Sequence, residues 1–381
     1  MKNKLAAWLP IGVFLSLTLV FSVWNLVRPT RSFSENENRY LAQFPEITPE
    51  AVLDGDFSEE YETYLADQFP LRDSWISLKT RMELLIGKKD INNVYFGDDG
   101  WLIDKYSGTL DEDRIADNLS KLGDFTSYAA ELLGSDHVRV MLVPTASGVL
   151  DNRMPPFAED FDQAALIAQA AGLCPDGVTL DLLPVLSEHK EEPIYYRTDH
   201  HWTTLGAYYG YAAWAESIGF TPYAQEDFTV ETASDAFYGT THSKVNVSVR
   251  PDSILRYTPN WPVSYHLTFN LGEKESDSLY DETKLEGKDK YSYYLGGNNP
   301  IVEISSSSGE EGRRLLIVKD SYSHCFAPFA VNHFEETTLI DLRYFNLGVK
   351  QYMEQEEFTD VLVLYSTANF ADDRNLNTLV K

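Results

Sequence analysis

Short apolar runs that alternate with amphipathic helical stretches constrain the fold of this chain more than any other feature. Apolar runs of about four to eight residues, bounded by turn residues, are typical of strands that are buried on both faces of a parallel sheet. Helices between such strands act as the crossovers that a parallel sheet needs. The sequence therefore predicts an α/β domain with a parallel sheet. The predicted strands are residues 138–143, 178–182, 315–318, 338–342 and 360–365, and the predicted helices are 111–133, 160–172, 205–218 and 347–357.

Residues 220–300 interrupt this alternation. They are rich in Thr, Ser, Asp and Tyr and have no sustained helical period, which predicts an irregular β insertion. Residues 238–244 are its most polar stretch, and we interpret them either as a lid over a site or as a surface hairpin. Earlier in the chain, residues 94–103 predict a hairpin, and residues 57–85 predict a pair of helices broken at Pro70.

A charge-free apolar stretch from Leu5 to Val27 is long enough to cross a bilayer. Lys2 and Lys4 precede it and no small-x-small cleavage site follows, so we expect an uncleaved signal anchor in the cell membrane, with a single pass and an extracytoplasmic main domain. Two arginines just beyond the stretch weaken the orientation argument, and a cleaved export signal is the alternative. The predicted organisation is an anchor at 1–31, a linker and helical lead-in at 32–90, and a main domain at 91–381 with its insertion at about 220–300.

The net charge of −28 limits the partners of this 381-residue chain. This charge argues against a nucleic acid as partner, because nothing in the composition could neutralise its phosphates. An anionic membrane surface would also be repelled. At 43% hydrophobic residues the chain is nevertheless able to bury a full-sized core, so a folded protein is expected.

The two cysteines, Cys174 and Cys325, indicate little about function. Two cysteines are too few for a structural zinc site of four cysteine or histidine ligands, and their separation is not that of a redox C-x-x-C motif. A disulfide outside the cell and two separate buried thiols remain as the alternatives.

A candidate nucleophile follows the apolar run at 315–318. Residues 319–324 read Lys-Asp-Ser-Tyr-Ser-His. A buried strand that ends here and gives way to a helix leaves the Ser321 hydroxyl at the carboxyl edge of the sheet, next to free backbone N–H groups. An ordinary helix cap at Asp320 is the alternative interpretation.

A second motif supplies the groups that a serine nucleophile needs. Asp199, His200 and His201 lie just before the predicted helix at 205–218. If this segment is extended, Asp199 and His201 point the same way, so that the carboxylate orients the imidazole and the imidazole faces Ser321. His200 then points elsewhere and is interpreted as structural.

Two other interpretations of this motif stay open. Asp199, His200, His201 and His242 are possible metal ligands, but adjacent histidines rarely converge on one ion and no H-E-x-x-H pattern is present. We therefore predict no metal. The other alternative is a noncatalytic Asp–His pair.

Polar residues after two other strands complete the predicted site. Asn369 follows the strand at 360–365, and Arg343, Tyr344 and Asn346 follow the strand at 338–342. Acyl transfer needs donors for the oxyanion, and we predict the Ser321 N–H and the Asn369 amide for this role. Loop caps are the alternative for each of them.

These motifs resemble a known family. The Asp-Ser block and Asn369 are similar to blocks I and III of SGNH hydrolases, but here the Asp-x-His pair precedes the serine. That order resembles the circularly permuted SGNH domains of the alginate O-acetyltransferase AlgJ/AlgX group, and the D-H-H-W string is similar to the bacterial DHHW protein family. The likeness covers most of residues 90–370, although Lys319 stands where the SGNH serine block has glycine. The matching residues are Asp199, His201, Trp202, Ser321, Tyr322 and Ser323.

The resemblance implies an O-acetyltransferase or acetylesterase that acts on a cell-surface or exported polysaccharide, or on another acylated glycan. Ser321 is then the nucleophile, His201 the proton shuttle and Asp199 its orienting group. No cofactor is implied, and a membrane partner is expected to supply the acyl donor. A catalytically inactive glycan-binding or scaffold protein is the main alternative, and a metal-dependent hydrolase is another. The residues expected at the oxyanion or the substrate are Asn369, Tyr322, Trp202, Arg343 and Tyr344.

Overall fold

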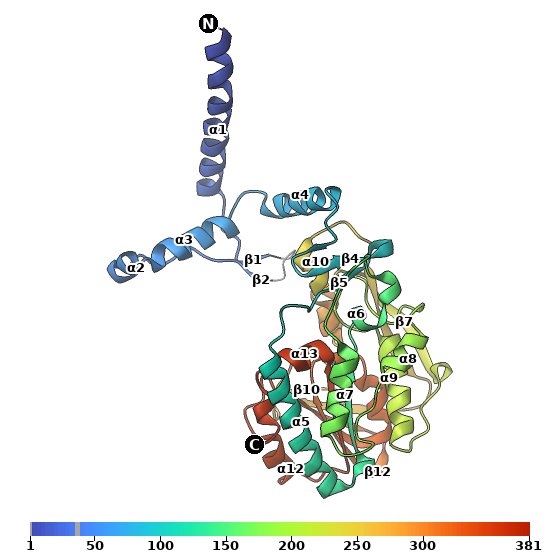
Figure 1. Ribbon diagram of the computed structural model, residues 1–381. Helices are drawn as coiled ribbons and strands as arrows, with labels where there is room; N and C mark the ends of the chain where they lie inside the picture. Colours follow the sequence, from blue (N-terminus) through green and yellow to red (C-terminus); the bar gives the residue numbers. More distant parts are fainter. Residues whose placement is uncertain (1, 35–38) are drawn as a thin grey trace. The chain divides into compact units, whose positions relative to one another are not determined.

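The structure is a computed structural model that describes residues 2–34 and 39–381 (Figure 1). The chain forms two compact units. The first unit holds the chain up to Ile91 together with Ser243–Ser248, and the second holds Asn92–His242 and Val249–Lys381. Residues 35–38, part of the predicted linker, lie outside the described residues.

The first unit begins with a long apolar helix, α1 (Lys2–Val27). Its stretch Trp8–Val27 has a mean hydropathy of 1.9, and none of that stretch is buried inside the protein. By length and composition this stretch is able to cross a membrane. Among the described residues, no other helix meets the same criteria.

Shorter elements follow α1 in the same unit. The pair of helices predicted at 57–85 is confirmed, and it is broken at Pro70. The buried Asp67 carboxylate ends the first helix of the pair and accepts hydrogen bonds from the Arg39 guanidinium (2.6 and 2.9 Å) and the Ala42 N–H (2.8 Å). These bonds, the Arg39 bond foremost, lower the pKa of Asp67. The elements are β1 (Phe33–Ser34), β2 (Arg39–Tyr40), α2 (Pro49–Asp54), α3 (Asp56–Asp67) and α4 (Arg72–Leu85).

A mixed sheet forms the centre of the second unit. Within the described residues its order is β10 (Lys274–Ser276), β9 (Tyr265–Phe269), β11 (Ile301–Ser306), β13 (Phe334–Asp341), β12 (Glu310–Lys319), β14 (Asp360–Ser366) and β6 (Val138–Val143). β13, β12, β14 and β6 run parallel to one another, whereas β11, β9 and β10 pair antiparallel. The prediction of a parallel sheet holds for four strands only. β9 and β10 of the insertion, and β11 directly after it, add antiparallel strands to this sheet.

One predicted strand is missing. β6 coincides with residues 138–143, and β12, β13 and β14 contain the apolar runs predicted in that part of the chain. Residues 178–182, in contrast, form a single bridge, between Thr179 and Val140. The Asp181 carboxylate accepts a hydrogen bond from the Leu183 N–H (2.9 Å), and this turn leads the chain into α8 (Leu183–Glu188) instead of along the sheet.

Helices cover both faces of the sheet, so alternate strand residues pack into two different cores. Leu315 and Ile317 pack with α9 (Thr204–Ser217) and α11 (Ala327–Ala330). Leu316 and Val318 point the other way and pack with the second set of helices. The predicted helices are present, although the last is shorter than residues 347–357. The second set is α5 (Glu112–Leu133), α7 (Gln163–Leu173), α12 (Val349–Met353) and α13 (Thr367–Asp372).

The predicted insertion contains β strands, as expected, separated by loops and short helices. β7 (Phe228–Phe237) and β8 (Asp252–Pro259) form an antiparallel pair, and α10 (Thr240–Val245) lies between them in the chain. The hairpin predicted at 94–103 is also present, as β4 (Val94–Phe96) and β5 (Leu102–Asp104).

A buried histidine makes the stability of the second unit depend on pH. His333 Nε2 lies 2.7 Å from the Tyr211 hydroxyl, and burial lowers the pKa of His333 to about 4. The unfolded chain therefore binds one more proton at this position between about pH 6.5 and pH 4, so stability falls as the pH falls through that window. Between about pH 7 and pH 4, the wild type should lose about 3 kcal/mol more unfolding free energy than His333→Gln. Urea unfolding in detergent measures this, and equal losses would contradict it.

Candidate active site

The predicted nucleophile lies at the carboxyl end of β12. The strand ends at Lys319, and Asp320 caps the short turn Ser321–His324 by accepting a hydrogen bond from the Tyr322 N–H (2.8 Å). Asp320 is therefore a cap, as the alternative interpretation held. The cap also keeps Ser321 at the edge where ligands bind in sheets with parallel strands.

Ser321, His201 and Asp199 form one continuous chain of hydrogen bonds. Ser321 Oγ lies 2.7 Å from His201 Nε2, and His201 Nδ1 lies 2.5 Å from Asp199 Oδ1. All three side chains are buried. A hydroxyl, an imidazole and a carboxylate in this order are the arrangement that activates a serine for nucleophilic attack.

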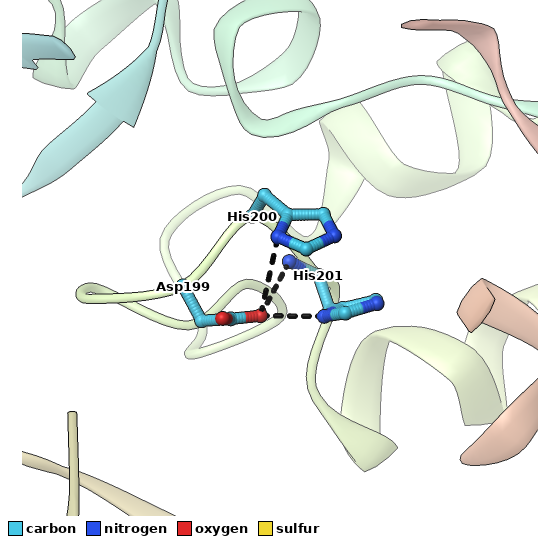
Figure 2. Close-up of side chains that lie close together, drawn as sticks. All are labelled: Asp199, His200 and His201. Atoms are coloured by element: carbon cyan, nitrogen blue, oxygen red, sulfur yellow. Dashed lines mark hydrogen bonds and ion pairs between the residues drawn. The ribbon is translucent and has the colours of Figure 1, made fainter. Parts of the chain in front are cut away.

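The contact between Asp199 and His201 arises from a tight bend and not from the extended backbone that we predicted. Asp199 Oδ1 accepts hydrogen bonds from both the backbone N–H (3.1 Å) and the ring of His201, an Asx-type turn (Figure 2). The prediction that His200 points elsewhere is also corrected. Its ring lies over His201 with centroids 3.8 Å apart, and its Nδ1 is 3.8 Å from Asp199 Oδ1.

The start of α10 holds the other oxygen of the Asp199 carboxylate. Asp199 Oδ2 accepts hydrogen bonds from the Thr240 N–H (2.7 Å) and the Thr240 hydroxyl (3.0 Å). A Cβ atom at Gly239 would lie 2.2 Å from the same carboxylate, so this close approach requires glycine. We interpreted residues 238–244 as a lid or a hairpin. In the structure, Gly239 and Thr240 of this stretch support the Asp199 carboxylate.

These contacts keep the carboxylate ionised. Burial alone would raise the pKa of Asp199, but the two neighbouring imidazoles and the donors from His201 and Thr240 outweigh burial and hold the pKa below its ordinary value. An ionised Asp199 is the acceptor that fixes the tautomer of His201.

An aromatic ring from the insertion packs against the catalytic imidazole candidate. Tyr291 stacks on His201 with centroids 3.8 Å apart and planes 12° apart, and its hydroxyl donates to the Ser321 carbonyl (3.0 Å). Tyr291 therefore restricts the rotation of His201 and ties the insertion to the serine turn. Sequence reasoning missed this residue, because Tyr291 lies in a Tyr-rich stretch without a distinguishing motif.

The predicted oxyanion donors lie at the same edge. Asn369 Nδ2 donates to Asp320 Oδ2 (2.7 Å), which also accepts from the Ser366 N–H (2.9 Å) and hydroxyl (3.0 Å). The Asn369 amide carries two hydrogens, and the hydrogen bond to Asp320 uses one of them. The Ser321 N–H donates to no acceptor in residues 2–34 and 39–381.

Lys319 is directed away from the reacting groups. Its side chain is buried, and its Nζ donates to Asp341 Oδ2 (3.0 Å) and to His324 Nε2 (2.8 Å). Arg343 binds the same Asp341 carboxylate through Nε (2.8 Å) and Nη2 (2.6 Å). Burial lowers the pKa of Lys319 and, with the Lys319 charge, that of His324, so His324 is neutral. Lys319 thus belongs to a buried ion pair beneath the sheet edge.

A polar cavity of about 270 Å³ opens beside Asp320. Arg343 and Asn369, two of the predicted substrate residues, line this cavity together with residues 372–375. Tyr344 is about half exposed, with the Arg343 guanidinium 5.5 Å from its ring centroid. The cavity offers both hydrogen-bond donors and acceptors, as the binding of a sugar requires.

Two residues predicted at the substrate lie beneath the site. Trp202 and Tyr322 are fully buried; the Trp202 Nε1–H donates to the Tyr322 carbonyl (2.8 Å), and the Tyr322 hydroxyl donates to the His200 carbonyl (2.5 Å). Both rings have their polar atoms engaged within the protein. The structure therefore corrects their expected position: they join the histidine bend to the serine turn and do not reach a surface open to substrate.

Asp199, His200 and His201 also form a group of potential metal ligands among the described residues, with ligand atoms within 4.8 Å of one another. Most of these atoms already make hydrogen bonds. His200 Nδ1 lies 2.6 Å from the Thr240 hydroxyl, and His201 Nε2 faces Ser321. An ion bound by these three residues would have to displace those bonds.

The two cysteines are free thiols in separate cores. Cys174 packs on the face of the sheet that carries α5 and α7, and Cys325 packs on the face that carries α9. Burial raises the pKa of the Cys325 thiol to about 12, which keeps it protonated and unreactive.

Solved structures of other proteins share this fold. A DHHW family protein from Eubacterium siraeum is 27% identical, with a TM-score of 0.60 over 76% of this chain and 95% of that chain. PatB1 of Bacillus cereus is 21% identical, with a TM-score of 0.61 over 74% of this chain and 97% of that chain. At this identity, the likeness to PatB1 concerns the fold alone.

Sequence comparison adds a relative and a family. The probable alginate O-acetylase AlgJ of Pseudomonas syringae pv. tomato is 27% identical over 207 residues, which are 52% of this chain and 48% of that protein. The chain thus spans about half the length of this curated relative. The profile of the DHHW protein family matches residues 104–340, more than half of the chain. The resemblance predicted from the D-H-H-W string is confirmed, and this chain belongs to the DHHW protein family.

Proposed function

We propose that this chain is a serine-dependent O-acetyltransferase or acetylesterase that acts on a polysaccharide, or another acylated glycan, at the cell surface or outside the cell. The hydrogen-bonded chain from Ser321 through His201 to Asp199 carries the proposal. We further propose a circularly permuted SGNH-type domain, because the Asp–His motif precedes the serine in the chain and both meet at one edge of the sheet. This domain occupies residues 91–381.

The proposed reaction uses two acyl transfers. Ser321 Oγ attacks the carbonyl carbon of an acetyl donor while its proton moves to His201 Nε2, and Asp199 stabilises the imidazolium. The tetrahedral intermediate collapses, the donor's leaving group takes the proton from His201, and an acetyl ester remains on Ser321. A sugar hydroxyl then loses its proton to His201 and attacks this ester, which transfers the acetyl group and restores the serine. Water takes the place of the sugar in an esterase.

The oxyanion of each intermediate needs fixed donors. We assign this role to the Ser321 N–H, which has no acceptor among the described residues, and to the second hydrogen of the Asn369 amide. Asp320 orients that amide and caps the serine turn, so one carboxylate aligns both donors. Arg343 is proposed to contact the substrate from the adjoining cavity.

The substrate class rests on the relative as well as on the site. AlgJ, named as a probable alginate O-acetylase, suggests a polysaccharide acceptor. A polar cavity lined by an amide, a guanidinium and carboxylates, among them Asp320, the residue before Ser321, supports the same class.

We also propose that α1 is a single-pass signal anchor, with residues 32–90 as the lead-in and the main domain outside the cell. The apolar length of Trp8–Val27 and the lysines that precede it support this orientation. A membrane partner would then deliver the acyl donor to Ser321 at the outer surface.

A trapped acetyl-enzyme tests the proposal. The full chain, purified in detergent, is mixed with 4-nitrophenyl acetate, quenched in acid and digested for mass spectrometry. The peptide that contains Ser321 should carry one acetyl group, and nitrophenolate should appear in a burst equal to the protein concentration. An unmodified Ser321 in a protein that still binds glycan would overturn the enzyme and favour the inactive glycan-binding alternative.

Thr240 offers a second test of the same site. Thr240→Val removes one of the two donors to Asp199 Oδ2 and is expected to lower kcat by about 10- to 100-fold, as the loss of a hydrogen bond to a charged group does. Thr240→Ser keeps the hydroxyl and should restore most of that rate. Initial rates of ester hydrolysis measure both variants, and equal losses in both would show that packing, and not the hydrogen bond, matters at this position.

A further inference from the structure

Helix α4, in the first unit, carries an apolar stripe that is largely exposed. The stripe residues are between 45% and 79% exposed. At 3.6 residues per turn they fall within an arc of about 80° on the helix surface. A contiguous apolar face of this kind marks a binding surface in a folded protein. The stripe consists of Trp75, Leu78, Met82 and Leu85, and the residues that flank the helix, Leu71 and Ile86, are exposed as well.

The opposite face of α4 is the one that packs against protein. Thr80 is buried there, and its hydroxyl lies 3.1 Å from the Val245 carbonyl. The Asn246 amide also reaches back to the Asp73 carbonyl (3.4 Å). Because these contacts fix the rotation of α4 within the first unit, the stripe is held outward.

The stripe is continuous with the apolar helix α1. The Phe21 ring of α1 lies 6.3 Å from the Trp75 ring and 5.4 Å from the Phe69 ring, between centroids. Phe21 is six residues before Val27, where the apolar stretch ends, and six residues of helix are about 9 Å long. If α1 spans a bilayer, Trp75 therefore lies at the depth of about 5–10 Å at which in-plane amphipathic helices bury their apolar faces.

Charged residues border the stripe in the pattern of an interfacial helix. Lys79 and Arg81 are exposed and lie about 80° to either side of its centre. Lys88 and Lys89 follow the end of the helix and are exposed as well. Long cationic side chains at these positions keep their charge in water while their stems cover the apolar face, and Trp75 is the residue type that prefers the interface.

We infer that α4 lies in the plane of the membrane, with its stripe inserted among the lipid headgroups and upper acyl chains, as a second contact beside α1. The inference rests on the membrane anchoring proposed above. A lipid surface is the occupant that the contacts favour, because the stripe adjoins a helix that itself requires lipid. The first unit would then be attached to the bilayer at two places, which limits how far the chain can swing from the surface.

Depth measurements with spin labels test the inference on the full chain in phosphatidylcholine vesicles. Labels at Leu78→Cys and Met82→Cys should be much more accessible to oxygen than to a water-soluble nickel chelate. Labels at Ser77→Cys and Glu83→Cys, on the sides of α4 that turn away from the stripe, should show the reverse. The native cysteines are buried, so the introduced thiols take the label.

Any other pattern of label accessibility would contradict the inference. Stripe labels as open to the nickel chelate as the controls would place α4 in water. Stripe labels shielded from both reagents would indicate a protein partner, and broadening that disappears on dilution with unlabelled chain would indicate a second copy. A label at Leu15→Cys reports on α1 alone. It therefore shows whether the proposed membrane anchor fails or only the proposed membrane contact of α4. The acetyl-enzyme experiment is independent of both.

Discussion

Ser321→Ala is expected to lower kcat/KM for acetate release from a chromogenic ester by a factor of about 10⁴ to 10⁶, as the loss of a triad nucleophile does. Without the hydroxyl, His201 has no proton to accept, and only the oxyanion donors remain to stabilise attack by water. Initial rates over a range of ester concentrations measure the effect. Equal rates for the two proteins would refute a nucleophilic Ser321.

A neighbouring serine gives the matched control. Ser323 lies in the same turn, but its buried hydroxyl donates to the Asp320 carbonyl (3.0 Å) and does not contact His201. Ser323→Ala is therefore expected to keep most of the activity and to lose only the modest stability of one hydrogen bond, about 1 kcal/mol. A loss as large as that of Ser321→Ala would mean that the turn, and not the nucleophile, had been disturbed.

Asp341→Asn is expected to lower the free energy of unfolding by about 3–5 kcal/mol, the cost of breaking a buried ion pair from one side. In the unmodified protein, the buried ammonium of Lys319 lies 3.0 Å from a carboxylate oxygen of Asp341. The substitution removes this counter-charge. Burial already lowers the pKa of Lys319, so deprotonation provides a partial escape. The loss should therefore shrink as the pH rises towards the pKa of an unfolded lysine, and urea unfolding at neutral and alkaline pH measures both effects.

The double variant Lys319→Met/Asp341→Asn separates the charge from the shape. With both charges gone, the site contains an apolar chain in place of the unpaired ammonium, and the double variant is expected to be more stable than Asp341→Asn alone. Arg343 still faces the amide at position 341 and is partly open to solvent, so its charge stays hydrated. A double variant as unstable as the single one would show that Arg343, and not Lys319, depends on Asp341.

Much of the fold was predictable, because local patterns carry it. A run such as residues 138–143 is buried on both faces, so its apolar composition alone predicts β6. Residues 178–182 have a similar composition but belong to a turn, since Asp181 bonds to the start of α8. The pairing of β9 with β10 and with β11 was not predictable, because it depends on contacts between segments that have no shared local pattern.

The candidate site was likewise predictable only in part. Ser321, Asp199 and His201 were found because their types and order form a recognisable motif. Thr240 and Tyr291 were missed as supports, because a threonine or a tyrosine has no special chemistry until the insertion brings it against Asp199 or His201. Trp202 and Tyr322 were expected at the substrate because motif membership does not distinguish a residue that reacts from one that packs beneath the reacting groups.

From the order of its residues alone, this chain is assigned a hydroxyl, an imidazole and a carboxylate suited to acyl chemistry, on an α/β scaffold behind an apolar helix. The folded molecule settles how they are arranged: the bend that joins Asp199 to His201, the support from Thr240, and the ion pair that removes Lys319 from the site. The reason is physical. Chemical type and local periodicity reside in neighbouring residues, whereas hydrogen-bond geometry and burial depend on residues that meet only when distant segments pack together.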